Sequence, residues 1–344
     1  MNKITIIRTV FLFFLVTLTC AIVGSPIIAD LLHTEKLVID TDGGGDDIIT
    51  IILILLAYKK KVSNYQIVGI TCTYGNTDEK NVEKNVLEAL TMVNESLIPV
   101  FGGAQKPLTT SFTSDHFFGI DGFGDFKFEK TITAKIDESM HAAMALVQLA
   151  KKYQGQLSIL SLGPQTNIAM AIALDSQFIH NVKRFYIMGG SVTGIGNIMP
   201  GKEFNFVMDP VSAYISLNSF KSEPCLLFPW DTVITANIPK KWRIDVLGTK
   251  NSEIIKFINK GEAIALNNSD SFWSAADIMC AAVMMWPDLI TKSITCNVSP
   301  ILEGEGKGAV MVDYINHTKK FKNAQIIQDI QVSVYQQKIL ELFS

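Results

Sequence analysis

Short apolar runs alternate with longer stretches of helical spacing through most of this chain. The runs are rich in β-branched residues and are bounded by turn-forming ones, so they predict buried strands. They are Lys36–Asp40, Tyr65–Thr73, Gln156–Leu162, Val182–Met188 and Cys225–Phe228. This succession of strands and helices predicts an α/β fold, namely a doubly wound, mainly parallel sheet with Rossmann-like topology.

Helices are predicted between these strands. Asp46–Tyr58 is apolar throughout, whereas Asp78–Asn94 places its apolar residues at helical spacing. Another helix is expected through Ala169–Leu174, and one more after Asp209, where an acidic cap precedes a proline. Doubly wound sheets carry their active sites at the carboxyl ends of the strands, so we expect the chemistry in the loops that follow them.

No linker, charge block or internal repeat divides the chain. We therefore expect residues 25–344 to form one domain. Within it, the segment Asp115–Asp125 is rich in glycine and aromatic residues, and it is expected to form a flap over an active site rather than part of the core.

Residues 1–24 have the order of a secretory signal peptide. Lys3 and Arg8 precede an apolar run from Val10 to Val23, and small or turn-forming residues follow at Gly24–Pro26. Because this order is typical of a cleaved signal, we expect a secreted protein with no membrane contact after cleavage. An uncleaved membrane anchor is the alternative, since the uncharged stretch is long enough for one.

Composition narrows the class of protein. The 344 residues are 48% hydrophobic and 18% charged, which is typical of a packed globular protein rather than a disordered one. The formal net charge is −3, and no basic run or arginine-rich stripe occurs. Nucleic acid is therefore not an expected partner.

The cysteines and sequons agree with secretion without proving it. Cys20 would leave with the signal, and the other four cysteines are widely spaced without a CxxC pair. This spacing argues against a zinc ribbon or a dense disulfide scaffold, while buried thiols and one or two bridges both stay open. Asn-x-Ser/Thr sequons, the mark of a glycoprotein, occur at Asn94, Asn267, Asn297 and Asn316.

The segment Asp40–Asp47 (DTDGGGDD) concentrates four carboxylates between an apolar strand and an apolar helix. So many like charges between buried elements are costly unless a cation neutralises them. Oxygen ligands select a hard cation, calcium or magnesium, over zinc. Three consecutive glycines let the backbone fold tightly, so Asp42 and Asp47 can approach one ion from two sides.

Three other interpretations of this segment are weaker. A solvated acidic turn that caps a helix needs one aspartate rather than several. An EF-hand needs glutamate at the twelfth loop position, which is Ile51 when counted from Asp40. A haloacid-dehalogenase-like phosphatase also has Asp-x-Asp after a strand, with Asp40 and Asp42 as nucleophile and acid. The continuation Gly-Gly-Gly-Asp-Asp is foreign to that family.

The segment VIDTDGGGDD, residues 38–47, resembles the signature of the inosine-uridine-preferring nucleoside hydrolases, which usually has Pro-Gly in place of Gly43-Gly44. The glycine variant is similar to secreted invertebrate members, including insect purine nucleosidases. Further blocks that resemble the family follow in the same order, and together they imply the nucleoside hydrolase fold. They are Gly75-Asn76 with Asn81 and Asn85, Pro99-Val100 with Gly102–Pro107, Leu162–Ala169, Met188–Gly190, and Asn197 with Glu203–Asn205 and Asp209-Pro210.

The resemblance implies a reaction and a cofactor. Members hydrolyse the N-glycosidic bond of a ribonucleoside to free base and ribose, with calcium and no organic cofactor. Calcium would be bound by Asp42, Asp47, the backbone carbonyl of Leu162, and Asp277. Asp42 would also be the catalytic base that takes a proton from the attacking water.

The resemblance also implies a substrate-binding shell around the ribose. Such a shell discriminates strongly, because a substrate without a hydroxyl leaves buried partners unpaired. Its expected members are Asp46, Asn76, Asn197, Glu203 and Asn205, and Met188 is expected to line the substrate pocket.

The base-binding half departs from the family pattern. Relatives carry histidine or tryptophan just before the last calcium aspartate, where this chain has Ala276, and often His-Gly in the flap, where it has Phe118-Gly119. Aromatic residues could stack on a base instead and favour purines. Trp273 is the residue that we include in the site on this ground; Phe117, Phe118 and Trp230 are further candidates.

Two functions therefore stay open. The first is a secreted, calcium-dependent hydrolase of ribonucleosides, with purine nucleosides expected. The second is a secreted nucleoside- or calcium-binding protein without activity, in which Ala276 and Phe118 have replaced the leaving-group acid. A small nucleoside is the expected partner in both, and relatives commonly form homo-oligomers.

Overall fold

A computed structural model describes residues 34–109 and 111–344 of the chain. The predicted signal peptide, residues 1–24, lies outside the described residues. Within the described ranges, no helix combines the length and the apolar character needed to cross a membrane.

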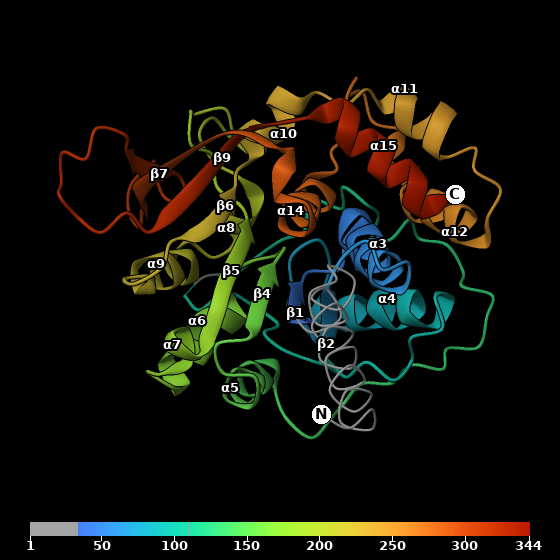
Figure 1. Cartoon of the computed structure of the whole chain (residues 1–344), viewed down its shortest axis with the longest axis horizontal. Coiled ribbons are helices and arrows are strands. Elements are labelled where there is room, and N and C mark those ends of the chain that lie inside the picture. Colours follow the sequence, from blue (N-terminus) through green and yellow to red (C-terminus); the bar gives the residue numbers. More distant parts are fainter. Residues whose placement is uncertain (1–33, 110) are drawn as a thin grey trace, which may run out of the picture.

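A nine-stranded sheet runs through the molecule in the order β3-β2-β1-β4-β5-β6-β9-β7-β8 (Figure 1). Neighbouring strands are parallel from β3 to β9, whereas β7 is antiparallel to β9 and β8 is antiparallel to β7. The predicted mainly parallel α/β sheet is confirmed. The strands are β1 (Glu35–Thr41), β2 (Tyr65–Cys72), β3 (Val100–Phe101), β4 (Leu157–Ser161), β5 (Val182–Met188), β6 (Cys225–Phe228), β7 (Ile290–Pro300), β8 (Val310–Asp313) and β9 (Ala324–Ile330).

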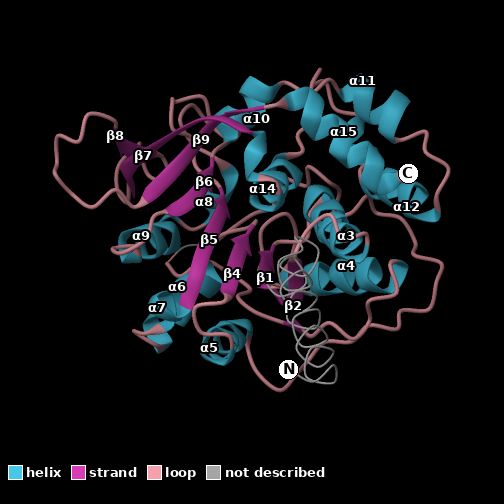
Figure 2. Cartoon of the chain, viewed as in Figure 1, coloured by secondary structure: helices cyan, strands magenta, loops and turns pink. Residues whose placement is uncertain are grey.

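Helices cover both faces of the sheet (Figure 2). A hydrophobic cluster lies on each face of the sheet, and strand β1 contributes to both. Leu37 and Ile39 belong to one cluster and Val38 to the other, because successive side chains of a strand point to opposite faces. The helices are α3 (Gly45–Lys59), α4 (Glu79–Met92), α5 (Ala142–Lys152), α6 (Thr166–Leu174), α7 (Phe178–Asn181), α8 (Phe204–Met208), α9 (Pro210–Ser219), α10 (Trp230–Ala236), α11 (Lys240–Trp242), α12 (Glu253–Gly261), α13 (Ala263–Leu266), α14 (Ala276–Met285) and α15 (Val332–Phe343), with shorter turns at Arg243–Leu247 and Pro287–Leu289.

The topology marks the place where a ligand can bind. The chain builds β1, β2 and β3 outward in one direction and then continues with β4 on the other side of β1. Such a reversal leaves a crevice at the carboxyl ends of the two central strands, where doubly wound proteins bind ligands. Asp42 follows β1 and Leu162 follows β4, so both lie beside this crevice.

Helix α3 reaches the same crevice from within the core. Its residues are apolar on all sides and nearly all buried, which is typical of a central helix. It packs against α14, and the first turns of both helices are acidic. Two helix N-termini with acidic side chains therefore meet at the carboxyl ends of β1 and β4.

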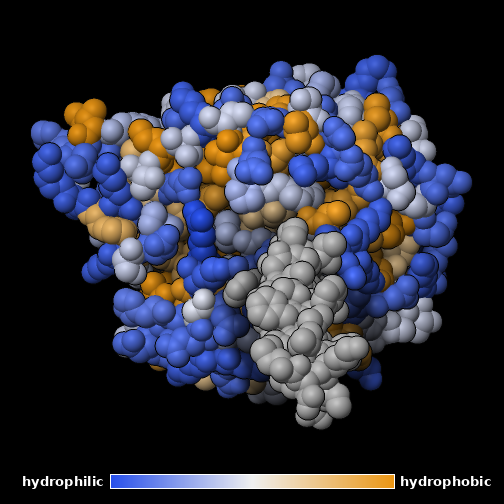
Figure 3. Space-filling view, in the orientation of Figure 1, coloured by the Kyte–Doolittle hydropathy of each residue, from blue (hydrophilic) through white to orange (hydrophobic). Residues whose placement is uncertain are grey.

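The four cysteines that the structure describes are buried and form no disulfide, which agrees with the buried-thiol alternative. They are Cys72, Cys225, Cys280 and Cys296. On the face drawn in Figure 3, hydrophobic residues are scattered among hydrophilic ones.

Candidate metal centre and adjoining pocket

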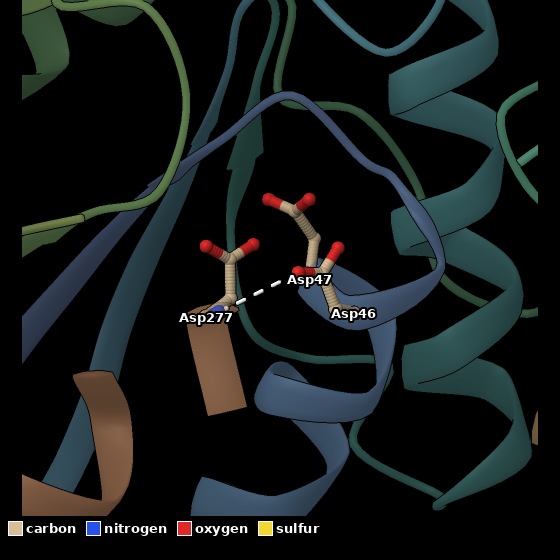
Figure 4. A group of neighbouring side chains, drawn as sticks. All are labelled: Asp46, Asp47 and Asp277. Atoms are coloured by element: carbon tan, nitrogen blue, oxygen red, sulfur yellow. Dashed lines mark hydrogen bonds between the residues drawn. The ribbon is translucent and has the colours of Figure 1, made fainter. Parts of the chain in front are cut away.

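Asp46, Asp47 and Asp277 form a buried group of carboxylates where α3 and α14 begin (Figure 4). One carboxylate oxygen of each lies within 4.8 Å of the others. The backbone N–H of Asp277 donates to Oδ2 of Asp46 over 3.5 Å. The dipoles of the two helices favour negative charge at this point, but their partial charges do not balance three carboxylates.

Asp42 adjoins this group from the turn after β1. Its Oδ1 accepts a hydrogen bond from Nδ2 of Asn76 at 2.9 Å, and its Oδ2 accepts one from the backbone N–H of Asn76 at 3.0 Å. Burial raises the pKa of Asp42 well above its usual value, and the neighbouring charge of Asp47 raises it further. Burial also raises the pKa of Asp46, of Asp47 and of Asp277.

Within residues 34–109 and 111–344, no positively charged side chain forms an ion pair with these four aspartates. Among the ion pairs of the described residues, none includes any of them. Ionised carboxylates at such burial need a compensating cation. A donor set made only of oxygen atoms fits a hard cation such as calcium or magnesium, so the buried group is consistent with a metal site.

The compact group differs from the predicted ligand set. It contains Asp47 and Asp277, but its third member is Asp46, for which only a ribose contact was predicted. Asp42 interacts with Asp47 and Asp46 without belonging to that group, so its role as a ligand stays a prediction. The carbonyl of Leu162, the fourth predicted ligand, accepts a hydrogen bond from Nδ2 of Asn205 at 2.7 Å. A carbonyl oxygen has two lone pairs, so one remains for a cation.

Local hydrogen bonds fix the side chain of Asp47 at the start of α3. The hydroxyl of Thr41 donates to its Oδ1 at 2.5 Å, and the backbone N–H of Gly44 donates to its Oδ2 at 3.0 Å. The second of these bonds closes a cap at the start of α3. Gly43 has φ of 68°, a left-handed conformation in which glycine avoids strain.

Asp40 is separate from the metal-binding group, although it belongs to the same acidic segment. Its Oδ1 accepts hydrogen bonds from the hydroxyl of Thr71 at 2.6 Å and from Nδ2 of Asn167 at 2.9 Å, and burial raises its pKa to about 7. The same Asn167 also donates to the carbonyl of Cys72 and accepts from the N–H of Ala104. Asn167 thus ties β1, β2 and α6 together, a role that sequence reasoning missed although the residue lies in one of the family-like blocks.

A cavity of about 310 Å³ opens beside the carboxylates. It is lined by all five residues that were predicted as the ribose-binding shell, by Met188, which was predicted to line the pocket, and also by Leu162, Ala276 and Asp277. Asp42 and Asp47 are fully buried and do not line it. The five shell residues are Asp46, Asn76, Asn197, Glu203 and Asn205.

Backbone hydrogen bonds fix the shell before any ligand arrives. Glu203 caps α8, because its carboxylate accepts from the N–H groups of Asn205 and Phe206, and it also accepts from Gly190 at 2.7 Å. Burial raises the pKa of Glu203 to about 7. The side-chain oxygen of Asn197 accepts from the N–H of Phe204 at 2.9 Å. Side chains held in this way are preorganised for a polar ligand.

Apolar and aromatic side chains form the rest of the cavity lining. Phe117 and Phe118 reach it from the predicted flap, whereas Trp230 lines it from the start of α10 and Phe272 from a loop. The rings of Trp230 and Phe272 lie 6.1 Å apart between centroids. The segment 115–118 therefore contributes to the pocket wall, as a flap would.

The predicted stacking role of Trp273 is not supported by its position. Trp273 does not line this cavity, and its indole is 3% exposed. The indole N–H donates to Oε1 of Glu262 at 2.7 Å, while Nε of the buried Arg243 donates to Oε2 of the same carboxylate at 2.6 Å. Trp273 is thus part of a buried polar network behind the pocket wall.

Fold and site together define the class of this protein: a doubly wound α/β protein with buried aspartates next to a pocket at the ends of its central strands. The chain also matches the sequence model of a family described as inosine-uridine preferring nucleoside hydrolase, over residues 37–337. Because this match covers most of the chain, the protein belongs to the inosine-uridine preferring nucleoside hydrolase family.

Two curated relatives are named for the nucleosides on which they act. A probable uridine nucleosidase of Oryza sativa is 35% identical over 190 residues, which are 55% of this chain and 56% of that protein. The chain thus spans little more than half the length of this relative. A pyrimidine-specific ribonucleoside hydrolase of Klebsiella pneumoniae is 27% identical over 280 residues, which are 77% of this chain and 86% of that protein.

Solved structures show the same fold. An inosine-guanosine nucleoside hydrolase superposes with a TM-score of 0.80 at 23% identity, over 89% of this chain and 98% of that one. A purine-preferring ribonucleoside hydrolase from Gardnerella vaginalis gives a TM-score of 0.79 at 23% identity, over 90% of this chain and 98% of that one. At these identities the likeness establishes the nucleoside hydrolase fold.

A methyl group at Gly75 should disturb the metal-binding group. A Cβ atom there would lie 2.0 Å from Oδ2 of Asp42, so the carboxylate must move. We expect Gly75→Ala to weaken the affinity for Ca²⁺ by at least about tenfold, as measured by calorimetric titration. Gly155→Ala is the control, because a Cβ at that site meets nothing within 4 Å; its φ of 68° strains an alanine, so the two variants are compared in Ca²⁺ affinity and not in stability. Equal affinities of the two variants would contradict the close packing around Asp42.

Loss of the indole N–H of Trp273 should affect stability. Trp273→Phe leaves Oε1 of the buried Glu262 without its donor, so we expect the free energy of unfolding to fall by about 1–3 kcal/mol. Urea denaturation measures this change. Trp286→Phe is the matched control, since its indole donates to a carbonyl at the surface. An equal loss of stability in Trp286→Phe would show that the buried hydrogen bond from Trp273 to Glu262 contributes no more than one at the surface.

Proposed function

We propose that this protein is a secreted, calcium-dependent nucleoside hydrolase that converts ribonucleosides, preferably purine ones, into free base and ribose. The observation that carries the proposal is the arrangement of one cavity. It is lined by carboxylates that fit a hard cation, by polar side chains suited to a sugar, and by aromatic side chains. A ribonucleoside combines the matching parts: a diol, a ribose and a flat base.

Calcium would be held by Asp42, Asp47, Asp277 and the carbonyl of Leu162, with Asp46 beside them. These donors are hard oxygen atoms, and the group has no other source of positive charge among the described residues. When bound, the ion supplies positive charge that orients ribose hydroxyls and makes a neighbouring water more acidic.

The chain's own side chains would do the rest of the chemistry. Asp42 is proposed as the base that takes the proton from the attacking water, and its two hydrogen bonds from Asn76 keep its carboxylate in place. Glu203 and Asn205, both held by backbone contacts, are proposed to bind ribose. The ribose is then fixed while positive charge develops on it in the transition state.

The purine preference is the finer part of the proposal. The relatives named above are split, because two are named for uridine or pyrimidine nucleosides and two for purine ones. Trp230, Phe272 and Phe117 give this chain several aromatic side chains in the lining of the cavity. Two fused rings offer more stacking area than one, so a purine gains more from such walls.

Secretion is supported by the sequence of residues 1–24, which has the order of a cleaved signal peptide. The resemblance of the glycine variant of the acidic segment to secreted invertebrate members points in the same direction. An extracellular enzyme would meet millimolar calcium, a level at which even a modest site is filled.

A nucleoside assay tests the proposal. We expect the purified protein to release free base and ribose from purine nucleosides, and chelator treatment to abolish the release until Ca²⁺ is restored. Asp42→Asn should lower the turnover number by about 10²–10⁴-fold because it removes the base. Asp245→Asn is the control, since that carboxylate is exposed and lies on a surface helix.

Two other results of this assay would favour a different function. Tight nucleoside binding without release of base would favour the binding-protein alternative. Release of phosphate from a nucleotide, without base release, would instead favour the phosphatase interpretation.

A further inference from the structure

The loop after β5 forms one wall of the cavity. It covers residues 189–203, between β5 and α8, and its residues 196–198 line the cavity. Residues 193–195 and 197–200 are exposed. An exposed loop has few buried contacts to hold it, so its shape depends on the hydrogen bonds that it makes to the rest of the molecule.

Asp231 holds the start of this loop. The residue is buried and lies in the first turn of α10. Its Oδ2 accepts a hydrogen bond from the N–H of Val192 at 2.8 Å. Its Oδ1 accepts one from the N–H of Thr193 at 2.8 Å and another from the hydroxyl of Thr193. One carboxylate thus fixes two consecutive peptide groups of a segment that is distant in the sequence.

Ser191 connects this carboxylate to Asn197. Its hydroxyl donates to Oδ1 of Asp231 over 3.4 Å and accepts from the N–H of Gly196 at 3.0 Å, directly before Asn197. Oδ1 of Asn197 accepts from the N–H of Phe204, whereas its Nδ2 donates to no acceptor within the described residues. Asn197 lines the cavity, so this Nδ2 is available to a ligand there.

The carboxylate of Asp231 is bonded to this loop alone among the described residues. Its hydrogen-bond donors all come from residues 191–193, and no ion pair in the described ranges includes it. Asp231 does not line the cavity, although its neighbour Trp230 does. Any effect of Asp231 on a ligand must therefore pass through other residues.

We infer that Asp231 is a positioning residue for nucleoside binding, which holds the loop so that Nδ2 of Asn197 can donate to a ribose hydroxyl. The inference rests on the proposed function, since Asn197 is one of the expected ribose-binding residues. Without the carboxylate, the exposed loop occupies other positions as well. The hydrogen bond to ribose is then available in only a fraction of the molecules, and the apparent affinity falls by that fraction.

The variant Asp231→Asn tests this role, because it keeps the size of the side chain but replaces one accepting oxygen by an amino group. We expect the KM for inosine to rise about tenfold, the worth of one hydrogen bond, while kcat stays within about threefold. A loss of folded protein alone would lower the apparent kcat and leave KM unchanged. Asp137→Asn is the matched control and should keep the native KM. Asp137 also accepts from a loop N–H, that of Ser139 at 3.0 Å, but neither residue lines the cavity.

A double-mutant cycle shows whether Asp231 acts through Asn197. In the Asn197→Ala background the group to be positioned is absent, so Asp231→Asn should raise KM by less than about twofold. If Asp231→Asn does not fold, Ser191→Ala decides, because it breaks only the connection to Gly196. We expect Ser191→Ala to raise KM about threefold in the native background and to have no effect beside Asn197→Ala.

Failure of this inference is separable from failure of the proposed function. If the native protein cleaves inosine and the variants keep its KM, or if the rise in KM persists beside Asn197→Ala, the inference is overturned and the hydrolase proposal stands. If no nucleoside is cleaved, the hydrolase proposal fails, and calorimetric dissociation constants for inosine replace KM in the same cycle. The same pattern of changes then supports the positioning role; equal constants, or no binding at all, overturn it.

Discussion

The structure depends on one electrostatic constraint: four aspartates are buried together, and no cationic side chain in the described part of the chain forms an ion pair with them. Asp42, Asp46, Asp47 and Asp277 each have a raised pKa, and burial is the largest cause in every case. Two helix N-termini and a series of N–H donors lessen the repulsion without removing it. A hard cation removes it, and the same cation would give the adjoining pocket its chemistry.

The fold makes this concentration of charge feasible. Asp46 and Asp277 are separated by 231 positions in the chain, yet α3 and α14 begin side by side. The reversal of strand order between β1 and β4 leaves room beside them for a ligand. The close approach of Gly75 to Asp42 shows that the backbone packs tightly against this carboxylate. Family, fold and electrostatics thus agree on one place in the molecule.

Sequence reasoning succeeded where the signal was local or came in ordered blocks. Strands β5 and β6 have their predicted bounds, because each is a short apolar run between turn-forming residues. The five shell residues and Met188 lie around one cavity, and all of them come from the family-like blocks or the acidic segment. The antiparallel edge formed by β7 and β8 was not predicted, since its residues alternate only weakly between buried and exposed. The stacking role of Trp273 stays a prediction, because the sequence does not reveal that its indole N–H donates to the buried Glu262.

The most direct test is the stoichiometry of calcium binding, measured by calorimetric titration of protein freed of metal with a chelator. The account predicts one Ca²⁺ per chain, a higher midpoint of thermal unfolding when the ion is present, and loss of both effects in Asp277→Asn. Asp288→Asn, with an exposed carboxylate, should behave as the native protein. If the native protein binds no Ca²⁺, or if Asp277→Asn binds it equally well, the buried aspartates are not a metal centre and the account is wrong.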